Sequence, residues 1–242
     1  NLSLEDLFKI RPELSENPYL RTISEKFITG VLSAKGTTED LDVSNFKLNW
    51  GENTKFSAQA SLQNISTTEA FQFNIAQYSL TTNRTDIYKF IEEKELGISI
   101  PETFKLNGDL SGNLEEVRTK SLLESSQGIV SLKGELSNAE DIRFNTTLSI
   151  EDYRLDDLLQ NPKFGLLSLE LSADGEGSTM NTIDAALDLK IKTIDFNEYK
   201  YENLVFNGVL NDGNGEFTSN YKDKNLNYDL KATVDLDTTN IT

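Results

Sequence analysis

Two identical carboxylate residues are adjacent in the chain at three places, and these pairs are the first candidates for catalytic chemistry. They are Glu92-Glu93, Glu115-Glu116 and Asp156-Asp157. A glycoside hydrolase needs two carboxyl groups that face each other across a cleft. Residues that are neighbours in the chain do not face each other. These pairs therefore indicate solvated surface rather than a catalytic centre.

The sequence has no residue that could activate a nucleophile in the usual way. Its 242 residues include neither His nor Cys, which excludes disulfides, thiolate nucleophiles, His or Cys zinc sites and the commonest general base. Serines are plentiful, but no nucleophile elbow surrounds any of them. We therefore expect a protein that is not an enzyme and that uses no cofactor or metal.

Oxygen-bearing side chains alternate with glycine at Asp212-Gly213-Asn214-Gly215-Glu216, as they do at the start of a calcium-binding loop. The rest of the twelve-residue pattern and its distal Glu are missing. Asn, Asp and Gly also favour the positive φ angles of tight turns. We interpret this segment, and Asp174-Gly175-Glu176-Gly177, as turns between strands.

The net charge excludes one class of partner. With 23 basic and 40 acidic residues the formal charge is −17, and so acidic a surface repels phosphate backbones. We therefore expect no nucleic acid partner. The hydrophobic fraction of 37% is low for this length and favours an elongated shape with a thin core over a sphere.

Strict alternation of apolar and polar residues is the strongest structural signal. From Leu226 to Leu236 every second residue is apolar, which is typical of a strand with one buried face in an antiparallel sheet. Further strands are expected near 26–34, 46–50, 55–62, 71–75, 104–110, 128–136, 141–150, 167–173, 184–191, 199–210 and 215–221. We predict about fifteen strands joined by hairpins.

Only three short segments have a helical pattern, at 4–10, 86–96 and 155–160. Each has an Asp before an apolar pair, as in Asp86-Ile87-Tyr88, and strands containing glycine follow. This loose recurrence predicts approximate repeats that start near residues 1, 75 and 147, with no separate domains within 1–242. The chain begins at Asn1 without a leader sequence, so we expect an internal segment of a longer protein.

The apolar sides of these strands leave two architectures open. They could pack together as a closed sandwich, or they could curve around an open trough that binds apolar ligands. The repeats and the low apolar fraction favour the trough.

Three segments resemble the periplasmic β-repeat region of the TamB family, which lies within the wider AsmA-like superfamily. They are 106–112 (LNGDLSG), 157–165 (DLLQNPKFG) and 194–204 (IDFNEYKYENL). The resemblance covers most of the chain, and it rests on degenerate repeats rather than on an invariant site. It implies an elongated curved antiparallel sheet, an open half-pipe called a β-taco, with a few short helices.

The resemblance also implies a function. In the translocation and assembly module of Gram-negative envelopes, such a hydrophobic groove is thought to convey phospholipid acyl chains, or nascent outer-membrane protein strands, between the inner and outer membranes. This chain would be a periplasmic part of an inner-membrane-anchored protein that meets a BamA/TamA-like partner through its full-length form. The residues expected to line the groove are Phe71, Phe73, Ile75, Leu187, Leu189, Ile191, Leu226, Tyr228, Leu230, Val234 and Leu236.

A second function class is a β-sandwich module for adhesion or ligand recognition. A glycan site would need exposed aromatic rings, which only Trp50, Tyr78, Tyr199 and Tyr201 could supply. Trp50 is in phase with Phe46 and Leu48, so we expect it on the apolar side of its strand. That position makes the adhesion hypothesis weaker than the hypothesis of a lipid-conveying groove.

Overall fold

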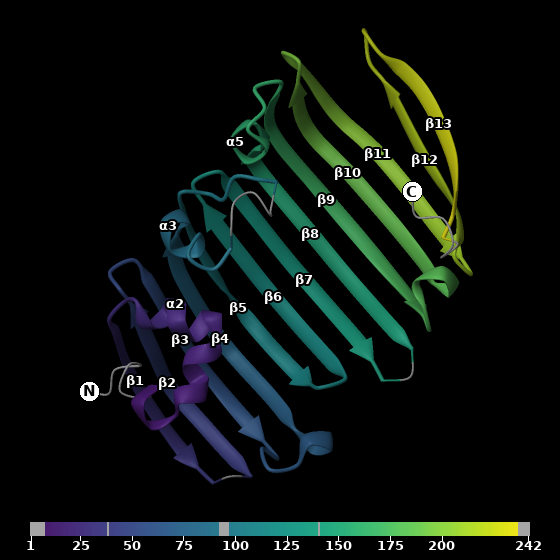
Figure 1. Cartoon of the computed structure of the whole chain (residues 1–242). Coiled ribbons are helices and arrows are strands. Elements are labelled where there is room, and N and C mark those ends of the chain that lie inside the picture. Colours follow the sequence, from purple (N-terminus) through teal and green to yellow (C-terminus); the bar gives the residue numbers. More distant parts are fainter. Residues whose placement is uncertain (1–7, 38, 92–96, 140, 237–242) are drawn as a thin grey trace.

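Thirteen antiparallel strands form one open sheet in the computed structural model, which describes residues 8–37, 39–91, 97–139 and 141–236. Each strand pairs with the strands before and after it in the sequence, so the sheet is a continuous meander from β1 to β13 (Figure 1). The strands are β1 (Ile28–Gly36), β2 (Asp40–Trp50), β3 (Thr54–Gln63), β4 (Gln72–Asn83), β5 (Thr103–Asn113), β6 (Glu116–Ser125), β7 (Gly128–Asn138), β8 (Ile142–Arg154), β9 (Phe164–Gly177), β10 (Asp184–Phe196), β11 (Tyr199–Asn211), β12 (Asn214–Lys222) and β13 (Asn227–Asp235). This confirms the expected all-β, open antiparallel architecture.

The short helical segments lie in the connections between strands. They are η1 (Pro12–Glu16), α2 (Pro18–Ser24), η2 (Thr68–Ala70), α3 (Arg84–Ile87), α5 (Leu155–Leu159) and η3 (Met180–Thr182). In Figure 1, α3 and α5 lie at the same end of the sheet, beyond the last residues of β4 and β8. We call this end of the sheet the helix end.

The helix expected at 155–160 is confirmed, whereas the one expected at 86–96 is helical only at its start. α3 spans Arg84–Ile87, and it starts earlier than expected because the Asn83 side chain accepts a hydrogen bond from the Asp86 amide at 2.9 Å. Residues 88–90 then form a turn, and residue 91 a bend. Residues 92–96, and most of the helix expected at 4–10, lie outside the described residues.

One predicted turn and one strand that the sequence pattern did not indicate also need correction. Residues 174–177 are not a turn, because they continue β9: all four pair with β8, and 174–176 also pair with β10. β6 was not expected at all, because Thr119 and Ser121 occupy two of its inward positions and hide the alternation. The turn at 211–215 is confirmed: Asp212 and Gly213 join β11 to β12 with φ angles of 50° and 72°.

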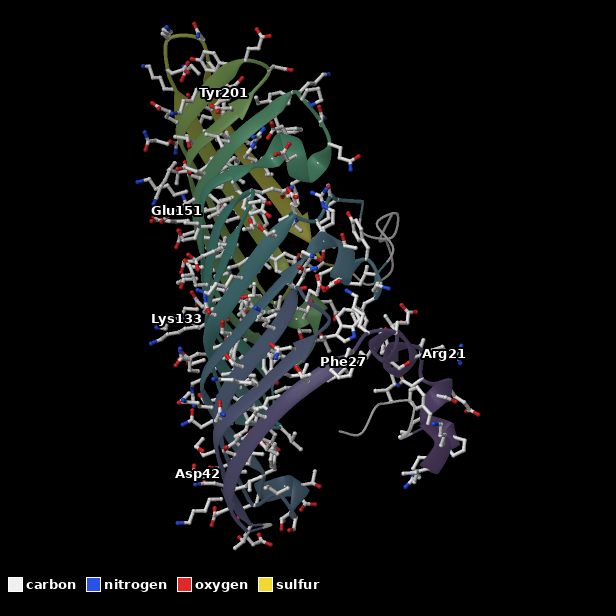
Figure 2. The ribbon with its side chains drawn as sticks, turned by 90° about the vertical axis from the view of Figure 1, so that its left-hand side faces the viewer. Arg21, Phe27, Asp42, Lys133, Glu151 and Tyr201 are labelled. Carbon is white, nitrogen blue, oxygen red and sulfur yellow. The ribbon has the colours of Figure 1, made fainter. Side chains whose placement is uncertain are left out.

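The sheet has two chemically different faces. Figure 2 shows the labelled side chains of Asp42, Lys133 and Glu151 pointing away from the side on which Arg21 and Phe27 lie. One central row across the other side is Gly108, Ser121, Leu132, Leu148, Leu171, Leu189, Phe206, Ser219 and Leu230. We call the side with this row the apolar face and the side with Lys133 the polar face.

The molecule has a single layer over most of its extent. Its accessible surface is 16021 Å², whereas a compact protein of this mass exposes about 11,000 Å². Among the described residues only six hydrophobic side chains are buried, and they are Trp50, Ile100, Tyr153, Leu167, Ile183 and Tyr221. The large surface and small core follow from an apolar face that has no second sheet over it.

Candidate functional site

The apolar face carries no charge at any paired strand position that the structure describes. The cross-strand pairs place aliphatic and aromatic side chains on this side, and its polar members are uncharged. Several leucines remain open to solvent: Leu132 is 38% exposed and Leu230 is 51% exposed. An exposed apolar surface that is continuous across so many strands marks a binding surface.

Glycines on this face lie beside aromatic rings from the neighbouring strand. Gly108 pairs with Tyr78, and Gly208 pairs with Phe217. A Cβ atom added to Gly208 would lie 2.4 Å from the Phe217 ring. Because glycine has no Cβ atom, the ring can lie across the adjacent backbone. These glycines therefore make room for the aromatic rings on the apolar face.

A first cap covers the helix end of β2–β4. Trp50 is 4% exposed, its indole N–H donates to the Ile23 carbonyl at 2.7 Å, and its ring centroid lies 5.2 Å from that of Phe90. The Lys26 ammonium lies 4.7 Å above the same ring and forms an ion pair with the buried Asp86. Trp50 is therefore unavailable to a glycan.

A second cap covers the helix end of β8–β10. It buries Ile100, Tyr153 and Leu167. The Ser99 amide donates to the Leu158 carbonyl of α5 at 2.7 Å, so residues 98–100 connect this cap to the segment that follows α3. The two caps close part of one end of the sheet and leave the middle of the apolar face open.

The predicted groove residues lie on this face, although they do not form one cluster. Eight of them occupy its cross-strand pairs: Phe73, Ile75, Leu187, Leu189, Ile191, Tyr228, Leu230 and Val234. Phe71 lies just before β4 with its ring 6.0 Å from that of Phe73. Leu226 lies in the turn before β13, and the Leu236 amide beyond β13 donates to Gly213 at 3.0 Å.

The centre of the apolar face is formed by strands that contain none of the predicted groove residues. β5–β9 separate Phe73 and Ile75 from the other predicted residues, and they contribute Leu106, Leu132, Leu148, Leu169 and Leu171. The alternation that identified β10 and β13 is also present in β7, β8 and β9. Extending the same rule to these strands would have found the central leucines.

Four tyrosines form a cluster at the helix end of β11–β13. Adjacent ring centroids are 4.8 Å apart for Tyr199 and Tyr201, 6.0 Å for Tyr201 and Tyr221, and 6.0 Å for Tyr221 and Tyr228. The hydroxyls of Tyr199 and Tyr221 both donate to one oxygen of Asp223, at 2.6 and 2.8 Å. We call these four rings with Asp223 the tyrosine cluster.

Hydrogen bonding fixes the charge of the tyrosine cluster. The Tyr199 hydroxyl, followed by the Leu226 amide, holds the pKa of Asp223 well below its ordinary value. The same hydrogen bond raises the pKa of Tyr199, and burial raises the pKa of Tyr221. At neutral pH Asp223 is therefore ionised, and the phenols of Tyr199 and Tyr221 are neutral.

A hollow of about 940 Å³ crosses β5–β11, with Leu132, Leu148, Leu171 and Leu189 in its lining. The residues one position to either side of this row also line it, such as Ser131 and Lys133. The residues two positions away, such as Val130 and Gly134, do not. A hollow above the apolar face would touch those residues, so this one runs along the polar face, with the backbone of the central row as its floor.

The described residues contain no group of acidic side chains that could hold a metal ion. None of the described helices has the length and apolarity needed to cross a membrane.

A scan against protein-family models found no match, and searches of curated proteins and of solved structures likewise found none.

Proposed function

We propose that the apolar face binds and conveys the acyl chains of phospholipids. The observation that carries this proposal is the charge-free, partly exposed apolar surface that extends across a single-layer sheet. Burial of each methylene group contributes about 0.8 kcal/mol. A long acyl chain thus gains enough free energy to stay bound without a deep pocket.

The same surface suits movement as well as binding. No ionic contact fixes an acyl chain at one place, because the paired positions of this face contain no Lys, Arg, Asp or Glu. Neighbouring positions along the sheet offer similar contacts, so a bound chain can shift without a large barrier. We expect low selectivity among acyl chains.

The resemblance to the TamB family extends this proposal to a cellular role. In that role the chain is a periplasmic segment of an inner-membrane-anchored protein, and lipid passes along the apolar face toward an outer-membrane partner of the BamA/TamA type. Strands of nascent outer-membrane proteins are the alternative cargo. Such strands would pair with the exposed edges of β1 or β13 and would not need the apolar face.

A face-matched pair of variants tests the proposal. Leu230 is half exposed on the apolar face, and Lys231 follows it on the polar face. We expect L230E to slow the transfer of a fluorescent diacyl phospholipid between donor and acceptor vesicles by about fivefold or more, because a carboxylate in the apolar path must be desolvated.

The control variant K231E changes the net charge by more than L230E does and should leave transfer within about twofold of the parent protein. Equal transfer by both variants would contradict the proposal. Loss of the folded state in L230E, measured by circular dichroism, would show instead that this side chain is sealed in a core.

A further inference from the structure

The tyrosine cluster contains an ionised carboxylate that has no cation. Among the described residues no Lys or Arg nitrogen lies within 4 Å of Asp223, although other carboxylates of the sheet, such as Glu170 and Glu216, have such partners. Tyr199, Tyr201 and Tyr228 remain partly exposed around it. An uncompensated negative charge beside aromatic rings attracts organic cations.

The first cap shows the same chemistry with a cation in place. There the Lys26 ammonium lies over the Trp50 ring and pairs with Asp86, whose other oxygen accepts from the Thr54 hydroxyl at 2.6 Å. Ring, carboxylate and hydroxyl together hold one ammonium group of this chain. The tyrosine cluster has the ring, carboxylate and hydroxyl components and lacks the ammonium.

The hydrogen bonds of Asp223 determine which kind of cation fits. One carboxylate oxygen accepts from the Tyr199 and Tyr221 hydroxyls, and the other accepts from the Asn225 and Leu226 amides at 2.7 and 2.6 Å. A carboxylate offers about four acceptor sites, so all are in use. A primary ammonium would compete for them, whereas a quaternary ammonium donates no hydrogen bond.

We propose that the tyrosine cluster binds a quaternary ammonium group through its ring faces and the charge of Asp223. The phenols that donate to Asp223 gain electron density, which strengthens their attraction for a cation. The group could come from the choline headgroup of a phospholipid, which rests on the proposed function above, or from a free small molecule. In the first case the headgroup sits at the helix end while the acyl chains lie along the apolar face.

Titration with tetramethylammonium tests the site without any lipid. In protein with isotope-labelled tyrosine, we expect saturable shifts of the Tyr199, Tyr201 and Tyr228 ring signals and none for Tyr78 or Tyr153. Tetramethylammonium should bind at least about threefold more tightly than methylammonium, with sodium chloride as the ionic-strength control. No saturable shift, or tighter binding of methylammonium, would overturn the proposal.

Variants locate the binding. Y201L removes the central ring and should weaken tetramethylammonium binding by about tenfold, whereas Y201F keeps the ring and should bind within about twofold of the parent protein. Y78L, on the same face and remote from the cluster, is the matched control. If Y201L does not fold, D223N takes its place, and unchanged affinity in a folded D223N protein would overturn the proposal.

A vesicle assay separates the two sources of the group. Faster transfer of phosphatidylcholine than of phosphatidylethanolamine, with the difference removed in Y201L, supports the lipid source. Binding of tetramethylammonium without this difference supports a free ligand and leaves the site in place. Failure of all transfer with intact tetramethylammonium binding would contradict the proposed function and not the site.

Discussion

Single glycines make room for the aromatic rings of the apolar face. Where Phe217 lies across Gly208, a larger residue must displace the ring. We expect G208V to lower the free energy of unfolding by about 1–3 kcal/mol, the usual cost of overpacking, as measured by urea denaturation. G134V, at a glycine where an added Cβ has only one neighbour within 4 Å, at 3.5 Å, is the control and should cost clearly less.

Asp223 should make the β11–β13 region sensitive to acid. Its pKa is lowered by the Tyr199 and Leu226 hydrogen bonds, so its contribution to stability is present above the unfolded value of about 3.9 and is lost as the pH falls toward the folded value. We expect the difference in melting temperature between the parent protein and D223N to shrink between pH 6 and pH 3. A constant or growing difference would contradict this assignment.

The chemistry of single residues was only partly predictable from the sequence. The phase of Trp50 with Phe46 and Leu48 placed it correctly on the apolar face. The tyrosine cluster could not be predicted from the sequence, because the hydrogen bond from Tyr199 to Asp223 joins residues 24 positions apart. That contact requires the pairing of β11 with β12, which is a property of the sheet and not of either segment.

Among the structural elements, the first cap depends on one buried ion pair. Removing the ammonium in K26M leaves Asp86 buried and unpaired at the first cap, and we expect a loss of about 2–4 kcal/mol. K89M, which breaks the exposed Lys89–Glu25 pair of the same cap, should cost less than about 1 kcal/mol. Urea denaturation measures both, and similar losses would show that the buried pair has no special role.

The elements also show where sequence patterns are reliable. Strands with leucine or isoleucine at alternate positions, such as β10, were predictable, whereas β6 was missed because Thr119 and Ser121 take inward positions on a half-exposed face. α3 covers only the start of the expected helical segment: Asn83 caps its first turn, and beyond Ile87 residues 88–90 form a turn. Apolar periodicity therefore indicated this helix but not its length.

At the scale of the whole molecule, the single-layer sheet predicts an extended particle. Thirteen strands spaced about 4.8 Å apart extend for about 58 Å across the sheet. The radius of gyration from small-angle scattering should clearly exceed the value of roughly 18 Å expected for a compact domain of this length. A value near 18 Å would mean that the sheet closes on itself in solution.

The two edges of the sheet predict weak self-association. β1 and β13 each have one side without a strand partner in the described residues, and Leu32 of β1 is 64% exposed. The charge of −17 opposes association, and salt screens that repulsion beyond a Debye length of about 8 Å at 0.15 M. Sedimentation should therefore show association that grows with salt and concentration, whereas a strict monomer under all conditions would contradict it.

Paramagnetic broadening shows whether acyl chains lie on the apolar face. The protein is titrated with a spin-labelled fatty acid while its leucine and valine methyl signals are followed. We predict strong broadening for Leu132, Leu189 and Leu230 and little for Leu122, Val205 and Val209, which lie on the polar face. Equal broadening on both faces, or broadening confined to the polar face, would contradict acyl-chain binding on the apolar face.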